Sequence, residues 1–166
     1  ERLGLLPAHC RSIIVGGTNG KGSTAAHLAA VLTAQGERVG LFTSPHLVRY
    51  NERIRLGARD ASDAELVAAF EHIEAARGTE TLTFFEYNAL AALLVFRQQA
   101  VTVMVLEVGL GGRLDATNVI DADVAVVCSV GMDHTDWLGD TLDAIGREKA
   151  GIFRPGRPVV LGSDCM

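Results

Sequence analysis

The sequence predicts an α/β protein, a three-layer parallel sheet with a phosphate-binding loop at the carboxyl ends of its strands. Short, nearly continuous apolar runs alternate with longer stretches that carry helix-capping signals. Continuous apolar runs are typical of strands buried on both faces, and their alternation with helices favours a parallel sheet. A glycine-rich loop joins the first apolar run to the first helical stretch, which is where α/β folds bind phosphate.

Composition fits one domain and excludes several classes of protein. The 166 residues are 48% hydrophobic, which excludes a disordered chain, and the net charge of −5 with no basic run argues against nucleic acid. No apolar run reaches the ~20 residues that cross a membrane. Three cysteines without CxxC spacing favour a reducing compartment. We therefore expect a cytoplasmic monomer whose partners are small molecules, with no nucleic acid and no membrane among them.

Five apolar runs are predicted as strands, and four stretches between them as helices. The strands are residues 12–15, 39–42, 101–108, 124–130 and 158–161. The helices are residues 22–35 (ending at Gly36), a stretch capped by Ser62 up to Arg77, a stretch capped by Thr83 up to Gln99, and residues 143–150. The polar connection over residues 45–60 holds at most one short strand, at 53–56, and is either functional or a solvated excursion. The chain begins without Met and ends after an apolar run, so we expect it to be part of a longer protein.

The loop after the first strand is predicted to bind phosphate. It consists of Gly17, Thr18, Asn19, Gly20, Lys21, Gly22 and Ser23. Small residues let backbone N–H groups point into one cavity at a helix N-terminus, and Lys21 adds a positive charge for the β- and γ-phosphates. The match to the pattern G-x-x-x-x-G-K-[ST] is imperfect, because Val15 replaces the first glycine and the hydroxyl is delayed to Ser23. The alternative is an ordinary glycine-rich turn.

Polar side chains follow three further strands, at the sheet edge where ligands bind in parallel sheets. Ser44 follows the second strand, Glu107 ends the third and His134 follows the fourth. Ser44 and Glu107 suit Mg²⁺ bound to ATP, whereas the chemistry of His134 favours a general base or a phosphate hydrogen-bond donor. Alternatively, Ser44 belongs to a turn, Glu107 to a strand-end ion pair, and His134 to a hydrogen-bonded loop.

A cluster of aromatic residues begins the third helical stretch. Phe84, Phe85 and Tyr87 either pack in the core or form a wall for a flat ligand. Such a ligand needs a hydrogen-bonding carboxylate nearby, which Glu86 or Asp115 could supply. Lys149 by default complements the dipole at the C-terminus of the last helix.

Six motifs together resemble the folylpolyglutamate synthase/dihydrofolate synthase group of the Mur ligase superfamily, in its bacterial bifunctional form. They are GTNGKGS, TSPHL…NERIR, TFFEY, EVGLGGRLDATN, DHTDWLG and REKAGIF. The resemblance covers almost the whole chain. It implies that residues 1–166 are a truncated, Mur-ligase-type central ATP-binding domain, and that the family's C-terminal glutamate-binding domain is absent from this chain.

The resemblance also implies roles for individual residues. Thr18 to Lys21 would hold the phosphates of ATP, with Ser23 near the metal, and Ser44, Glu107 and His134 would be ligands of Mg²⁺. Thr83, Phe84, Phe85, Glu86, Leu114, Asp115 and Ala116 would line the dihydropteroate pocket. Lys149 would be carried as a carbamate, and Lys21, Lys149 and His134 would form the catalytic set.

The implied reaction is an ATP-dependent ligation of L-glutamate to dihydropteroate or to folates. The acceptor carboxylate attacks the γ-phosphate, giving an acyl phosphate and ADP, and the glutamate amine then displaces phosphate. Two alternatives remain open, namely another P-loop kinase or NTPase, and a Mg·ATP-binding module that is not catalytic in this truncated form.

Overall fold

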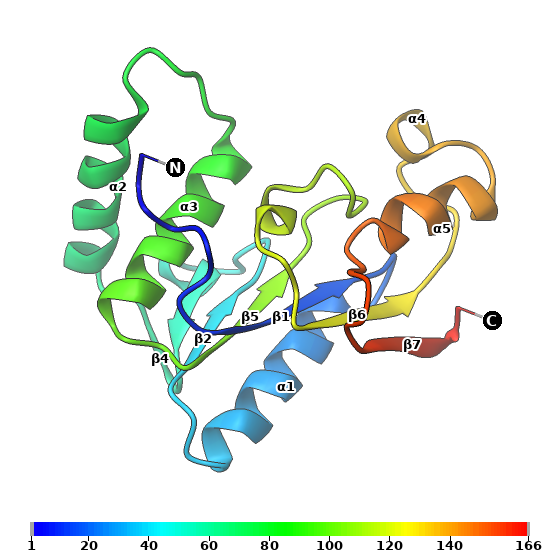
Figure 1. Cartoon of the computed structure of the whole chain (residues 1–166), viewed down its shortest axis with the longest axis horizontal. Coiled ribbons are helices and arrows are strands. Elements are labelled where there is room, and N and C mark those ends of the chain that lie inside the picture. Colours follow the sequence, from blue (N-terminus) through cyan, green and yellow to red (C-terminus); the bar gives the residue numbers. More distant parts are fainter. Residues whose placement is uncertain (1, 166) are drawn as a thin grey trace.

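A seven-stranded sheet is the middle layer of the structure, a computed structural model that describes residues 2–165 (Figure 1). The strands are β1 (Arg11–Gly16), β2 (Val39–Phe42), β3 (Ile54–Leu56), β4 (Arg59–Asp60), β5 (Val103–Glu107), β6 (Val124–Ser129) and β7 (Val159–Asp164). Their order across the sheet is β4-β3-β2-β5-β1-β6-β7. β2, β5, β1, β6 and β7 are parallel, which confirms the predicted parallel core of the sheet.

The edge of the sheet beyond β2 differs from the prediction. β3 pairs antiparallel with β2, and β4 pairs antiparallel with β3, so the connection over residues 45–60 contributes two strands. A turn at Gly57, whose φ is +60°, brings β4 back onto β3. A strand of two residues is too short to leave a hydrophobic pattern, so the sequence indicated at most one strand here.

Within residues 2–165, five α-helices and two 3₁₀ helices connect the strands. They are α1 (Lys21–Ala34), η1 (Tyr50–Arg53), α2 (Asp63–Arg77), α3 (Phe84–Gln98), η2 (Ala116–Val119), α4 (Thr135–Leu138) and α5 (Leu142–Ala150). The capping boxes of Ser62 with Glu65 and of Thr83 with Glu86 are both formed, as predicted. Gly36 follows α1 with a φ of +88°. The short helix α4 was not predicted.

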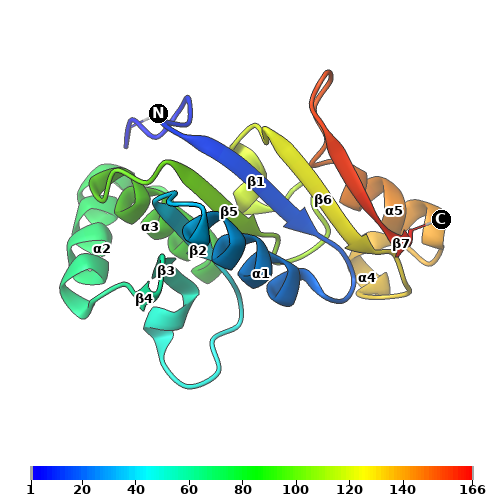
Figure 2. The ribbon, with the colours of Figure 1, turned by 90° about the horizontal axis from the view of Figure 1, so that it is seen from below.

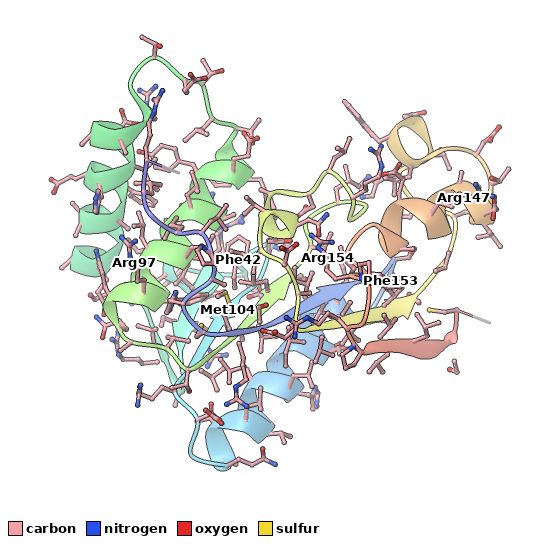
Figure 3. The ribbon with its side chains drawn as sticks, in the orientation of Figure 1. Phe42, Arg97, Met104, Arg147, Phe153 and Arg154 are labelled. Carbon is pink, nitrogen blue, oxygen red and sulfur yellow. The ribbon has the colours of Figure 1, made fainter. Side chains whose placement is uncertain are left out.

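Helices cover both faces of the sheet, which completes the three predicted layers (Figures 1 and 2). α1 packs on one face, where Ala25 and Ala29 contact a small core. α2 and α3 cover the other face over a larger core that includes Phe42 and Met104 (Figure 3). A Cβ at Gly40 would lie 2.5 Å from the ring of Phe96, so glycine lets α3 pack closely on β2.

The segment that precedes β1 packs beside α2 and α3. Arg97 of α3 donates hydrogen bonds to the carbonyls of Leu3 and Gly4 (Figure 3), and Arg2 donates to the carbonyl of Arg77. Among the described residues, no helix has the length and apolar character that a bilayer crossing requires.

Candidate functional site

The phosphate-binding loop lies between β1 and α1 and is held against the end of β6. The N–H of Thr18 donates to the carbonyl of Ser129 at 2.9 Å, and the N–H of Asn19 donates to the hydroxyl of Ser129 at 2.9 Å. The hydroxyl of Thr18 both donates to and accepts from the backbone of Gly131. A Cβ at Gly17 (φ +142°) would lie 3.1 Å from the backbone of β6, so this close approach requires glycine.

The N–H groups at the start of α1 are the ones left open for an anion. Those of Gly20, Lys21, Gly22 and Ser23 donate to no acceptor within the described part of the chain. The Nζ of Lys21 bends back onto the loop, where it donates to the carbonyls of Gly17 at 2.9 Å and Thr18 at 3.2 Å. Four free donors at a helix N-terminus with an adjacent ammonium form an anion-binding site.

Glu107, at the end of β5, is a buried carboxylate beside this loop. It is 4% exposed, and its Oε2 accepts a hydrogen bond of 2.7 Å from the N–H of Ser44. Burial raises the pKa of Glu107, while the Ser44 N–H and the charge of Lys21 act in the opposite direction. Among residues 2–165 no cation forms an ion pair with Glu107.

Gly22 gives the departure from the standard loop pattern a structural reason. A Cβ at this position would lie 3.3 Å from Oε1 of Glu107. The carboxylate therefore occupies the space beside the helix where the standard pattern places a serine or threonine side chain. Ser23, one residue later, has its hydroxyl bonded back to the carbonyl of Gly20.

His134, the third expected metal ligand, lies at the start of α4 with a largely exposed side chain. Its side chain is 53% exposed, and its Nε2 lies 3.5 Å from Asp133. Its backbone is left-handed, with φ +46°, at the start of α4. The structure thus joins Ser44 to Glu107, but within the described range no hydrogen bond or ion pair joins His134 to either of them.

Lys149 is buried in α5 rather than solvated at the helix terminus. It is 2% exposed, and burial lowers its pKa. The positive charge of Lys21 lowers this pKa further, and Asp133 acts against both. Lys149 does lie in the last turn of α5, where a cation complements the helix dipole, but its burial was not expected from the sequence. A lysine held toward its neutral form is nucleophilic.

The two phenylalanines at the start of α3 face different surroundings. Phe85 packs against Phe42, with ring centroids 5.6 Å apart, and against Gly109, where a Cβ would lie 2.6 Å from the ring. Phe84 is 63% exposed and lies beside Tyr50. A cavity of about 470 Å³ adjoins Phe84; it is lined by Tyr50, Phe70, Leu82, Thr83, Phe84, Tyr87 and Asn88.

The two segments expected to bind an aromatic ligand meet at Gly109. The N–H of Gly109 donates to Oδ2 of Asp115 at 2.9 Å. The same glycine packs against the ring of Phe85. The other oxygen of Asp115 accepts from the N–H and hydroxyl of Thr117, and Glu86 accepts from the N–H of Thr83. Both carboxylates are thus engaged in shaping their own segments. Leu114 projects from the same loop and is 80% exposed.

Sequence reasoning missed three residues of this region. Ser129 and Gly131 anchor the loop, and Arg53 lies buried at the sheet edge, 7% exposed. Ser129 could have been noticed as a polar residue near the end of the apolar run over residues 124–130. The four arginines over residues 45–60 look alike in the sequence, and only packing distinguishes Arg53.

The chain resembles known proteins along its whole length. Residues 15–164 match the Mur ligase middle domain family. The dihydrofolate synthase/folylpolyglutamate synthase of Escherichia coli K12 is 53% identical over 165 residues, which are 99% of this chain and 39% of that protein. The chain therefore spans about two fifths of the length of the curated relatives it matches.

Two solved structures are similarly close. One, E. coli FolC in complex with DHPP and ADP, superposes with a TM-score of 0.94 at 51% identity, covering 99% of this chain and 41% of that one. The other is a bifunctional folylpolyglutamate synthase/dihydrofolate synthase with Mn, AMPPNP and L-glutamate bound. It gives a TM-score of 0.88 at 54% identity, covering 95% of this chain and 38% of that one.

Proposed function

Since the chain belongs to the Mur ligase middle domain family, we propose that it is the ATP-binding part of a ligase that adds L-glutamate to dihydropteroate and to folates. One observation carries this proposal. The free N–H groups at the start of α1, Lys21 and the buried carboxylate of Glu107 meet at the carboxyl ends of β1 and β5. The loop of Asp115 and the start of α3 at Phe85 both pack on Gly109, which follows β5. The similarity to enzymes of this activity supports the same conclusion.

The terminal phosphates of ATP would bind at the start of α1. The N–H groups of Gly20, Lys21, Gly22 and Ser23 would donate to phosphate oxygens, and Lys21 would exchange its bonds to the loop carbonyls for the β- and γ-phosphates. Thr18 and Asn19 use their N–H groups to hold the loop on β6. Their contribution would be to fix its shape.

The residues present fit a Mg²⁺ ion at Glu107. The carboxylate is buried without a cation, and an oxygen donor of this kind is what Mg²⁺ prefers. Ser44 would add its hydroxyl, and the exposed imidazole of His134 would complete the set. When bound, the ion would neutralise phosphate charge during phosphoryl transfer.

The acceptor would lie between α3 and the loop after β5. Phe85 and Asp115 converge on Gly109, and the exposed side chains of Phe84 and Leu114 offer apolar surface to a flat ring. Thr83, Glu86 and Ala116 complete the two segments. Because both segments adjoin the ends of β2 and β5, a ring bound there would direct its carboxylate toward the phosphates.

The reaction would proceed in two displacements. A carboxylate oxygen of the acceptor attacks the γ-phosphorus, and the bond to ADP breaks. The amine of L-glutamate then attacks the acyl carbon, phosphate leaves, and the amine loses a proton. Lys21 offsets the developing phosphoryl charge. Lys149 would react through its neutral amine with CO₂, losing a proton and becoming an anionic carbamate that offsets the positive charge of its surroundings.

Release of ADP tests the proposal in the full-length protein that carries this sequence. We expect ADP to form with dihydropteroate plus L-glutamate, and also with tetrahydrofolate plus L-glutamate, in amounts equal to the ligated product. Lys21→Ala is the matched control, and it should release no ADP. ADP release that is independent of both acceptors would instead identify a nucleotide hydrolase or a kinase with another substrate.

A further inference from the structure

Arg53 differs from every other arginine that the structure describes. Ten of the others form ion pairs with carboxylates, and Arg38 and Arg97 donate to backbone carbonyls. Arg53 is 7% exposed, and its side chain has neither kind of partner within the described residues. Among residues 2–165, the one hydrogen bond of its side chain is that of 2.8 Å from Nε to Nδ1 of His46.

Aromatic rings supply the remaining contacts of the Arg53 guanidinium. Its central carbon lies 5.1 Å from the ring centroid of Phe84 and 5.9 Å from that of Tyr50. Cation–π contacts of this kind offset only part of the hydration that a buried guanidinium loses. A buried cation whose described neighbours are uncharged therefore lacks an anion.

The position of Arg53 indicates which anion that is. Its carbonyl accepts a hydrogen bond of 3.0 Å from the N–H of Thr43, at the end of β2, and the next residue, Ser44, donates to Glu107. Its guanidinium lies over the ring of Phe84, at the start of α3. Arg53 thus lies between the carboxylate expected to hold the metal and the aromatic side chain expected to contact the acceptor.

We propose that Arg53 binds a carboxylate of the acceptor substrate, which in dihydropteroate is the benzoate carboxylate that reacts. This inference rests on the proposed function. A guanidinium matches a carboxylate with two parallel N–H donors and thereby fixes its direction as well as its place. His46 would orient the guanidinium through Nε, which leaves the outer nitrogens for the substrate.

Equilibrium binding of dihydropteroate to the full-length protein, in the presence of Mg²⁺ and AMPPNP, tests the assignment. We expect Arg53→Gln to weaken binding about 10- to 100-fold, as for a lost charged hydrogen bond. Its affinity for the carboxamide analogue of dihydropteroate and for AMPPNP should not change. Arg53→Lys, which keeps the charge but not the fork, should be intermediate. Arg49→Gln is the matched control, because Arg49 is exposed and lies four residues away, and it should bind dihydropteroate like the unsubstituted protein.

The outcomes separate this inference from the function on which it rests. An unsubstituted protein that does not bind dihydropteroate overturns both. Equal binding of dihydropteroate by the unsubstituted protein and Arg53→Gln overturns only the role of Arg53. The residue would then be structural, joining η1 to α3 through its contacts with the rings of Tyr50 and Phe84. If Arg53→Gln does not fold, NMR of the unsubstituted protein tests the assignment instead. The Nε–Hε resonance of Arg53 is identified as the arginine signal that is missing from the spectrum of Arg53→Lys. The Arg53 signal should shift with dihydropteroate and not with the carboxamide, and an unmoved signal overturns the assignment.

Discussion

The backbone N–H of Ser44 donates a hydrogen bond of 2.7 Å to Oε2 of Glu107, which joins the end of β2 to the end of β5. The other oxygen of the same carboxylate faces Gly22 in the first turn of α1. One buried carboxylate therefore ties the end of β2 to β5 and lies beside the first turn of α1, at the edge where parallel sheets bind ligands. Its negative charge lies beside an anion-binding helix start, an arrangement that a bound divalent cation would stabilise.

Glu107→Gln should weaken Mg²⁺-dependent ATP binding by a factor of about 10 to 100, since the amide keeps the shape but removes an anionic ligand. Calorimetric titration of ATP with and without Mg²⁺ measures this. We expect the Mg²⁺-dependent part of the affinity to fall and the Mg²⁺-independent part to stay or rise. An unchanged Mg²⁺ dependence would make Glu107 a purely structural carboxylate.

Gly22→Ala should also impair Mg²⁺-dependent binding, although alanine is a better helix former than glycine. The new Cβ would lie 3.3 Å from Oε1 of Glu107, and the hydrogen bond to Ser44 limits how far that carboxylate can shift. The same titration of ATP with Mg²⁺ checks this. Ser23→Ala is the matched control in the same helical turn. Nucleotide affinity in Gly22→Ala equal to that of the unsubstituted protein would show that Glu107 moves freely.

Lys21→Ala should abolish detectable ATP binding and leave the fold intact. The Nζ of Lys21 contacts only loop carbonyls of Gly17 and Thr18 among the described residues, and it contributes nothing to the apolar cores. Circular dichroism and the midpoint of urea unfolding test the fold, and fluorescence of a labelled nucleotide tests binding. Loss of cooperative unfolding would contradict the position given to this loop.

The parallel part of the fold and its phosphate loop could be predicted because their signals are local. Strands buried on both faces read as unbroken apolar runs, and the capping boxes at Ser62 and Thr83 mark the starts of α2 and α3 within one residue. The strand indicated at residues 53–56 corresponds to β3. The two-residue β4 and the four-residue α4 are too short to leave a pattern in the sequence.

The sequence could not predict which charged residues of the site are buried. Lys149 and Arg53 occur in polar stretches that look like solvated surface, and only the packing of α5 and of η1 removes them from water. The capping role of Glu86 could be predicted, but the backbone contacts of Asp115 could not. The carboxylate of Asp115 accepts hydrogen bonds from the N–H groups of Gly109 and Thr117, which depends on loop geometry rather than on residue type.

Lys149 should react with CO₂ in the folded protein. Burial and the charge of Lys21 lower its pKa, so more of the amine is neutral near pH 8 than for an exposed lysine. In ¹³C-bicarbonate, NMR should show a carbamate signal that is lost on unfolding. Lys149→Arg is the control, because arginine stays protonated and forms no carbamate. A carbamate signal that persists in this variant would place the modification elsewhere.

Acid should destabilise the fold partly through Glu65 at the start of α2. Hydrogen bonds from Arg59 lower the pKa of Glu65 from 4.5 to about 2, with further hydrogen bonds from Ser62. Because the folded state favours the carboxylate, its stabilisation is present above pH 4.5 and is lost as the pH falls toward 2.

Glu65→Gln can keep the capping box but loses the charge, so it should lower the free energy of unfolding at pH 7 by about 1 kcal/mol or less. This difference from the unsubstituted protein should shrink in urea unfolding below pH 4.5, whereas Glu71→Gln, on the exposed face of the same helix, should show none. A difference that stays constant from pH 7 to pH 3 would mean that the charge of Glu65 adds nothing to folding.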